Sequence, residues 1–181
     1  MKSVSLNTKE IIIKSFWDLY KKEDFTKITI GKICKKANYD RTTFYRYFLD
    51  INDLLNQVEN DIISNIAERI KKAKSVSKNG INPLKFEYFT SIYGEFIVTF
   101  MEKGNRTFYN KFKNLIKEDV YNYFNLKFTD ESMKDFIFEF MISSFINSYA
   151  YWFRHQDKMP LETFVSIINK MMNSDFLKKT S

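Results

Sequence analysis

Glycine, proline and cysteine are scarce in this sequence. Its 181 residues include four glycines, two prolines and one cysteine. A sandwich or barrel of many strands needs frequent turn residues, so this scarcity argues against one and favours long helices with short connections. A single cysteine excludes a disulfide scaffold and is typical of a reducing compartment. The 44% apolar fraction is enough for a hydrophobic core without such cross-links.

Groups suited to catalysis or metal binding are equally scarce. The one histidine, His155, and the one cysteine, Cys34, are far apart in the sequence, whereas metal sites and nucleophilic triads usually combine several such residues. The glycines are isolated from one another, so there is no glycine-rich phosphate loop. A hydrolase that uses carboxylates alone is the enzymatic alternative, but no pair of acids stands out. We therefore expect no enzyme, no metal and no cofactor.

Long apolar runs are absent as well. Residues 1–8 contain no run of signal-peptide length. The most apolar stretch, residues 136–153, approaches the length of a membrane span, but Asn147 and several serines interrupt it. We expect this stretch to be a helix buried inside the protein or against a second copy. The chain is expected to be cytoplasmic and to have no membrane partner.

Apolar residues recur mostly at helical spacing, which predicts an all-α fold with about nine helices and no strand. The first helix is expected to begin after Asn7, which forms a capping-box signature with Glu10, and to end near Lys22. The only linker-like segment covers residues 75–82, and Pro83 suits the first position of the helix after it. The other helices are expected near residues 29–38, 40–48, 52–74, 83–104, 106–114, 117–127, 130–155 and 160–172.

Positive charge is concentrated between residues 27 and 48. This segment has a balance of +5 out of +7 for the whole chain, with Asp40 as its only acid. Thr29 is suited to cap one short helix, Asn38 to form the turn after it, and Asp40 to cap a second. The second helix is too short, and too polar on one face, to be explained by packing. Two helices joined by a tight turn, with a basic face rich in hydroxyl groups, are typical of a helix-turn-helix that binds the major groove.

Candidate DNA contacts follow from the positions of residues in this arrangement. At the start of the second helix, Arg41 and Thr42 are expected to read base edges. Thr29, Lys32, Thr43 and Tyr45 are expected to hold backbone phosphates. Tyr47 and Phe48 also suit the core of the small domain. The candidate DNA-binding residues are Thr29, Lys32, Arg41, Thr42, Thr43, Tyr45, Arg46 and Tyr47.

Four short runs in this region carry a family pattern. They are FTKITIGKIC at 25–34, ANYD at 37–40, TFYRYF at 43–48 and the leucine pair at 54–55. Together they resemble the DNA-binding domain of the TetR family of bacterial transcriptional regulators. The resemblance implies an all-helical homodimer that binds an operator through its first three helices, dimerises through its last two long helices and often holds a small effector. We expect a helix-turn-helix domain at residues 1–52 and a larger regulatory and dimerisation domain at residues 53–181.

Three residues depart from the usual pattern of that family. Asn38 stands where glycine is usual, Asp40 where a serine cap is usual, and Ile51 where a lysine usually contacts phosphate. Asparagine accepts the same left-handed backbone as glycine, so the turn is preserved. Asp40 adds negative charge near DNA. The loss of one phosphate contact at Ile51 is expected to reduce the salt dependence of binding by about 0.9 log units per log unit of salt.

Aromatic residues at helical spacing dominate the second domain, and most are expected to form its core. A pocket among them would be largely apolar with a few polar groups, which favours a small apolar or aromatic effector. The alternative is control by a protein partner, which a solid core with an exposed apolar patch would favour. The candidate effector-binding residues are Tyr93, Phe96, Phe100, Phe112, Phe145, Tyr149 and Trp152.

The two helices nearest the C-terminus predict a homodimer. The helix expected at 130–155 is too apolar for a surface element, and the helix at 160–172 carries a second apolar stripe, so two copies would form a four-helix interface. A dimer would also place two recognition helices in major grooves about 34 Å apart. The leading hypothesis is therefore an effector-controlled regulator, expected to be a repressor, that binds a palindromic operator. The candidate interface residues are Phe145, Tyr149, Phe153, Leu161, Phe164 and Ile168.

Overall fold

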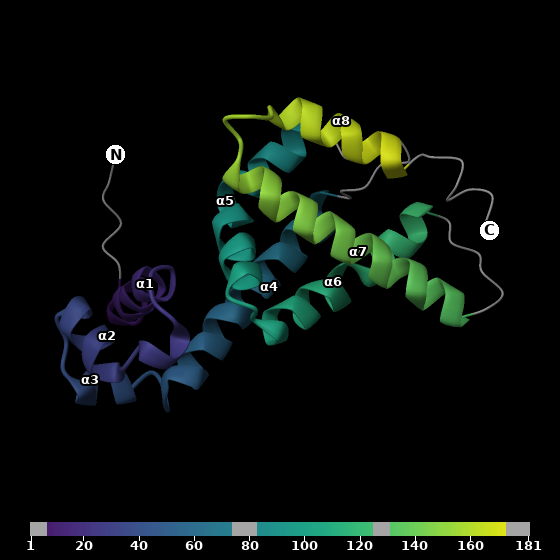
Figure 1. Ribbon diagram of the computed structural model, residues 1–181. Helices are drawn as coiled ribbons and strands as arrows, with labels where there is room; N and C mark the ends of the chain where they lie inside the picture. Colours follow the sequence, from purple (N-terminus) through teal and green to yellow (C-terminus); the bar gives the residue numbers. More distant parts are fainter. Residues whose placement is uncertain (1–6, 74–82, 125–130, 173–181) are drawn as a thin grey trace. The chain divides into compact units, whose positions relative to one another are not determined.

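The computed structural model describes residues 7–73, 83–124 and 131–172. Within these ranges all regular structure is helical, with eight α-helices, one short 3-10 helix and no strand (Figure 1). The all-α prediction is therefore confirmed. The chain divides into two compact units, residues 1–62 and 63–181. This division falls inside one helix, later in the chain than the boundary expected after residue 52.

The first unit is made of short helices with well-defined starts. Asn7 Oδ1 accepts a hydrogen bond from the Glu10 N–H at 3.0 Å, and Glu10 Oε2 accepts one from the Asn7 N–H at 2.8 Å, so the predicted capping box is present. The elements of this unit are α1 (Thr8–Tyr20), η1 (Phe25–Lys27), α2 (Ile30–Ala37), α3 (Arg41–Tyr45) and the first part of α4 (Ile51–Ala73).

The core of the first unit fixes α3 in place. Phe44 and Phe48 are at most 1% exposed, and their ring centroids lie 5.4 Å apart. Phe44 is the buried residue of α3, and the other side chains of this helix are exposed or half-buried. The core therefore holds α3 through one anchor and leaves the rest of the helix for other contacts. The fully buried apolar residues of this unit are Ile12, Phe16, Ile33, Phe44 and Leu54.

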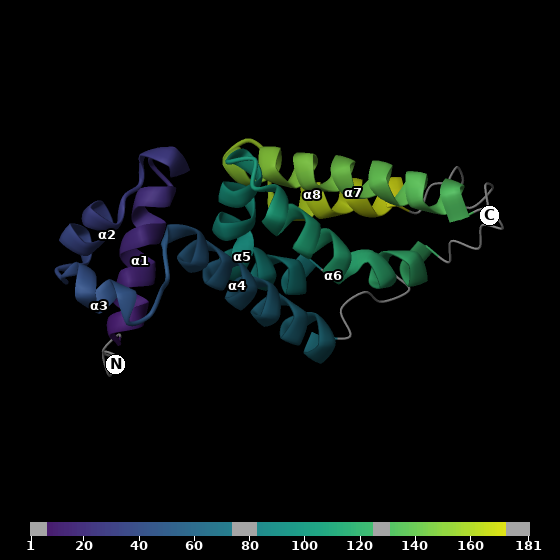
Figure 2. The same ribbon diagram turned by 90° about the horizontal axis from the view of Figure 1, so that it is seen from below.

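In the second unit, α5 packs against three other helices, α6, α7 and α8, and α6 packs against α7. Figures 1 and 2 both show α7 and α8 side by side. Gly104, with a φ of +65°, follows α5 and adopts the left-handed backbone that glycine accepts without strain. The helices of this unit, after the end of α4, are α5 (Pro83–Glu102), α6 (Arg106–Phe124), α7 (Glu131–Arg154) and α8 (Leu161–Met172).

The structure corrects the predicted helices in two places. Residues 106–124 form the single helix α6, where two helices were predicted, because no glycine or proline interrupts this range. α4 begins at Ile51, since Asp50 Oδ1 accepts a hydrogen bond from the Asp53 N–H at 2.8 Å. The predicted linker at 75–82 lies outside the described residues.

None of the described helices combines the length and the apolar composition that crossing a bilayer requires.

Candidate nucleic-acid interface

Side-chain caps define the ends of the helix-turn-helix formed by α2 and α3. Thr29 Oγ1 accepts a hydrogen bond from the Lys32 N–H at 3.2 Å, and Asp40 Oδ1 accepts one from the Thr43 N–H at 2.6 Å. Between the helices, Asn38 has φ 58° and ψ 43°, the left-handed conformation expected of this turn. Both predicted caps and the predicted turn residue are confirmed.

The cap of α3 also sets the charge of Asp40. The hydrogen bond from the Thr43 backbone N–H, followed by that from the Thr43 hydroxyl, holds the pKa of the Asp40 carboxyl below its ordinary value, and the Arg46 charge lowers it further. Asp40 is therefore ionised at neutral pH. The start of α3 carries one negative charge beside its basic residues.

The solvent side of α3 gathers the predicted DNA contacts of this helix. Tyr45 and Tyr47 are 56% and 39% exposed, although buried Phe44 and Phe48 lie next to them in the sequence. The core therefore includes Phe48 but leaves much of Tyr47 in solvent. The exposed or half-buried candidates of this segment are Arg41, Thr42, Thr43, Tyr45, Arg46 and Tyr47.

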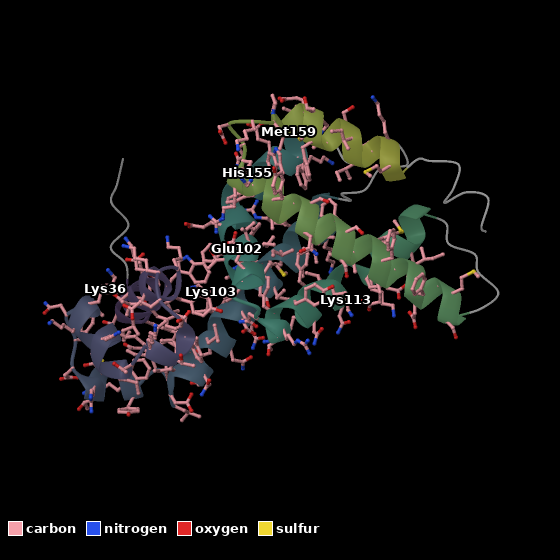
Figure 3. The ribbon with its side chains drawn as sticks, viewed as in Figure 1. Lys36, Glu102, Lys103, Lys113, His155 and Met159 are labelled. Atoms are coloured by element: carbon pink, nitrogen blue, oxygen red, sulfur yellow. The ribbon has the colours of Figure 1, made fainter. Side chains whose placement is uncertain are left out.

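Three lysines of the basic segment form ion pairs with acids that sequence reasoning did not connect to them. The acids lie on α1 or just after it, outside the basic segment. All six side chains are partly exposed, so each pair contributes less than about 1 kcal/mol, and these lysines can exchange a carboxylate for a phosphate. The pairs are Lys27 with Asp24 at 3.3 Å, Lys32 with Glu23 at 2.6 Å, and Lys36, labelled in Figure 3, with Asp18 at 3.4 Å.

In the part of the chain that the structure describes, no acid forms an ion pair with Lys35, Arg41 or Arg46. Two of these cations, Arg41 and Arg46, belong to α3 and its C-cap. They can contact a polyanion without first losing a partner. Two of these three cations therefore lie on α3 or at its C-cap.

The predicted effector residues are distributed over separate aromatic clusters. Tyr149 and Trp152 of α7 pack with Phe86 and Phe164, with ring centroids 5.7 Å apart for Phe86 and Tyr149 and 4.8 Å apart for Trp152 and Phe164. Phe145 joins this cluster, 6.3 Å from Tyr149. Burial raises the pKa of Tyr149 to about 12, although its hydrogen bond to Thr90 acts in the opposite direction.

The remaining effector candidates lie elsewhere in the second unit. Phe100 stacks on Phe108 with centroids 4.3 Å apart, and Phe112 stacks on Phe108 at 6.2 Å. Phe96 is half-buried on α5. The hydroxyl of buried Tyr93 is already used, because it accepts a hydrogen bond from Arg69 Nε. Among the residues that the structure describes, no ring contact joins these positions to Tyr149 or Trp152.

Sequence reasoning missed the contact between Arg69 on α4 and two tyrosines of α5. Arg69 Nε donates to the Tyr93 hydroxyl at 2.8 Å, and its guanidinium carbon lies 5.0 Å from the Tyr88 ring centroid. Hydrogen bonds to Tyr88 and then to Tyr93 raise the pKa of Arg69. The three residues are far apart in sequence, so no local pattern could have indicated the contact.

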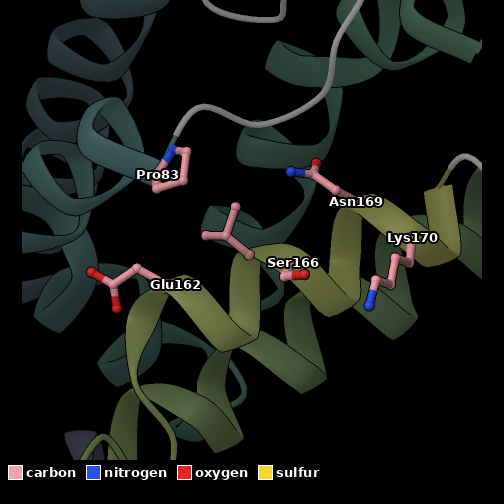
Figure 4. Close-up of a pocket in the computed structure, with 6 residues that line it drawn as sticks. Pro83, Glu162, Ser166, Asn169 and Lys170 are labelled. Atoms are coloured by element: carbon pink, nitrogen blue, oxygen red, sulfur yellow. The ribbon is translucent and has the colours of Figure 1, made fainter.

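An open recess of about 380 Å³ lies between the start of α5 and one side of α8 (Figure 4). It contains none of the seven predicted effector residues. This recess is open to solvent, whereas a small apolar effector favours an enclosed site that covers most of its surface. The lining residues are Pro83, Glu162, Val165, Ser166, Asn169 and Lys170.

The predicted interface residues face largely into the single chain. Tyr149, Phe164 and Ile168 are only 3%, 4% and 8% exposed, so most of their surface is covered within the single chain. Phe145, Phe153 and Leu161 are half-buried. The same two helices expose other large apolar side chains, named here the α7–α8 apolar face: Met133, Phe136, Phe140, Tyr151, Ile167 and Met171.

Comparisons with known proteins agree with this architecture. A family model described as a transcriptional regulator C-terminal region matches residues 81–174, more than half of the chain. A TetR transcriptional regulator from Streptococcus agalactiae 2603V has a similar crystal structure, with a TM-score of 0.69, 23% identity, and coverage of 92% of this chain and 94% of that chain. The dihydroxyacetone kinase operon activator DhaS has a TM-score of 0.57 and 20% identity, with coverage of 97% and 98%. No curated protein matches the sequence.

Proposed function

Because this chain belongs to the TetR family of transcriptional regulators, a non-enzymatic family, we propose that it binds a palindromic operator as a homodimer through α3. The observation that carries the proposal is the solvent side of α3, where exposed tyrosine, threonine and arginine side chains surround the single buried anchor Phe44. Arg41 and Arg46 supply positive charge there without ion-pair partners among the described residues. Operator binding would place the protein in the bacterial cytoplasm.

The direct test is a fluorescence-anisotropy titration of the full chain with duplex DNA from upstream of its own gene. Replacing Thr43→Ala together with Tyr45→Ala is expected to weaken binding at least about tenfold, because two groups expected at the phosphates are removed. The variant keeps the buried anchor Phe44, so it is expected to stay folded. Thr107→Ala, an exposed position on α6, serves as the control. Absence of binding at low salt, or full affinity in the double variant, would contradict the proposal.

Operator binding is expected to repress transcription. DhaS, a protein of similar fold, is named an operon activator. A reporter gene placed downstream of the bound sequence therefore has to be scored for both a decrease and an increase in expression. Lower expression with the protein than without it supports repression, and higher expression contradicts it.

The homodimer is proposed to form through the α7–α8 apolar face. Phe136, Phe140 and Tyr151 are 70%, 66% and 63% exposed in the single chain, on the helices expected to dimerise. Large exposed apolar side chains on neighbouring helices favour association with a matching surface, and an isologous contact covers both copies at once. This surface lies on the same two helices that the sequence pattern indicated for the interface.

Control of DNA binding has two candidate forms. A small apolar effector acting among the aromatic residues of the second unit is the form expected from the sequence. The closely packed rings of Tyr149, Trp152 and Phe164 favour a protein partner instead, because an effector could enter there only if these rings separated. Either ligand would act by shifting the balance between DNA-binding and non-binding conformations.

The two forms of control can be separated with Trp152 as a probe. The chain has two tryptophans, so Trp17→Phe leaves Trp152 as the single tryptophan, which is excited selectively at the red edge of its absorption. A panel of apolar and aromatic compounds is added while tryptophan emission and DNA anisotropy are both recorded. A compound that changes both signals supports the small effector. A panel that changes neither supports control by a protein partner.

A further inference from the structure

Arg41 is the first residue of α3, but its guanidinium lies at the start of α2. A methyl group on Gly31 would be 3.4 Å from Nη2 of Arg41 and 3.9 Å from Oγ1 of Thr29. Both polar atoms therefore lie within 4 Å of one point above the Gly31 backbone. Because glycine has no side chain, this space is open to the long side chain that comes from α3.

Both groups at this point have hydrogen-bond donors to offer. The Thr29 oxygen accepts from the Lys32 N–H, which leaves its hydroxyl hydrogen to donate to a ligand. Arg41 forms no ion pair with an acid in the described parts of the chain. A phosphate has several acceptor oxygens in a small volume, and a guanidinium matches that geometry with two parallel N–H groups.

A base edge is a less suitable target for Arg41 in this position. Reading a guanine requires the guanidinium to extend into the major groove along the exposed side of α3. Arg41 would have to leave the space above Gly31 to do so. Thr42 and Arg46 are exposed on α3 and its C-cap and need no such rearrangement.

We propose that Arg41 and Thr29 together bind one DNA phosphate, and that base reading falls to Thr42 and Arg46. The assignment rests on the proposed function, operator binding through α3, and adds to it the separate roles of these side chains. It also changes the expectation from the sequence, in which position alone made Arg41 a reader of bases.

The two roles differ in their dependence on salt and on sequence. Each phosphate contact contributes about 0.9 to the slope of log affinity against log salt, whatever the sequence of the duplex. A base contact changes discrimination at one base pair and leaves the slope nearly unchanged. The slope and the base preference of a single variant therefore decide between the two.

The test uses the full chain and a 30-base-pair duplex that the wild-type protein selects from a random pool, with an unselected duplex of the same length for comparison. Anisotropy titrations at several NaCl concentrations give affinity and slope. Arg41→Gln is expected to weaken binding to both duplexes by a similar factor, about tenfold, and to lower the slope by about one. The order of affinities among single-base variants of the selected duplex is expected to stay the same. Arg41→Lys keeps the charge and is expected to keep most of the slope.

Three further variants sharpen the result. Thr42→Ala is expected to change discrimination at one base pair without changing the slope. Thr29→Ala combined with Arg41→Gln is expected to lose less affinity than the product of the two single losses, since both residues bind one phosphate. Gly31→Leu fills the space that the guanidinium occupies, and it is expected to reproduce the loss seen in Arg41→Gln.

The proposal is overturned if Arg41→Gln keeps the wild-type slope, whether discrimination at one base pair is lost or nothing changes. Circular dichroism of each variant separates loss of contact from loss of fold. If Arg41→Gln does not fold, the slope of Gly31→Leu decides in its place. A wild-type protein that selects no duplex from the pool contradicts operator binding itself, and this result differs from a failure of Arg41 alone.

Discussion

Gly94 of α5 and Tyr149 of α7 lie so close together that a methyl group on Gly94 would be 2.7 Å from the Tyr149 hydroxyl. The same methyl group would also collide with Cε2 of Phe153. Non-bonded heavy atoms do not approach so closely in a packed core, so a larger residue at 94 would force the Tyr149 and Phe153 side chains to move. Tyr149 is only 3% exposed, so this movement would disturb the packing around it.

Gly94→Ala is therefore expected to destabilise the protein. The overpacking costs about 1 to 3 kcal/mol, which outweighs the gain of about 1 kcal/mol that alanine brings to a helix interior. Gly31→Ala in α2 is the matched control, because its methyl group meets the nearest atom at 3.4 Å. Urea unfolding followed by circular dichroism measures both. A Gly94→Ala protein as stable as the wild type would show that α5 and α7 separate without cost.

Alkaline pH is expected to weaken folding through Tyr149. Its pKa is raised from 10 to about 12 by burial, so the folded state favours the neutral phenol. The stabilisation is complete below pH 10 and is lost as pH rises toward 12, because the unfolded chain ionises first. The loss amounts to about 2 to 3 kcal/mol. Urea titrations between pH 9 and pH 12 are expected to show a smaller decline for Tyr149→Phe than for the wild type.

Tyr45→Phe provides the comparison for that experiment. Tyr45 is 56% exposed and lies outside the proposed dimer interface. This variant is expected to follow the wild-type pH profile. A Tyr149→Phe protein that also follows it would mean that the phenol is not protected by burial.

Glu23→Gln is expected to strengthen DNA binding. Glu23 Oε2 lies 2.6 Å from Lys32 Nζ, so removing the carboxylate charge makes the Lys32 ammonium group more available to a DNA phosphate. We expect affinity for any duplex to rise about threefold to tenfold at low salt and by less at high salt. Asp157→Asn makes the same change in net charge at an exposed position of the second unit. Equal affinities for the two variants would show that net charge alone is responsible.

Phe136→Ser together with Phe140→Ser is expected to convert the protein to a folded monomer. Both side chains are mostly exposed in the single chain, so their loss removes contact with a second copy and little of the core. Light scattering coupled to size-exclusion chromatography measures the mass. Leu84→Ser removes an equally exposed apolar side chain from α5 and is expected to leave the mass unchanged. A dimeric double variant would exclude this face as the interface.

The features that were predictable from the sequence are those decided by neighbouring residues. Asn7, Thr29 and Asp40 bind backbone N–H groups three residues away, and Asn38 is left-handed because of its own conformational preference. Helix starts and the turn of the helix-turn-helix therefore follow from local sequence. The continuous helix α6 was predicted as two helices although no glycine or proline interrupts residues 106–124, so the expected break had no local sequence signal behind it.

The features that were not predictable depend on packing between distant segments. Apolar residues lie around much of the circumference of α7, so the sequence does not indicate that Tyr149 faces the core and Phe140 the solvent. The position of the Arg41 guanidinium above Gly31 likewise depends on how α2 and α3 meet. The roles of the predicted DNA-binding and effector residues stay predictions.

The α7–α8 apolar face has a consequence for how much of this regulator a cell must make. In the proposed homodimer, a second copy covers Phe136, Phe140 and Tyr151, which a lone chain exposes to water. If this dimer is the form that spans two half-sites, its concentration below the dimerisation constant falls with the square of the chain concentration. Occupancy of an operator would then respond to protein abundance more steeply than one-to-one binding allows. The rate of protein synthesis and its dilution at cell division would therefore change operator occupancy, in addition to any ligand.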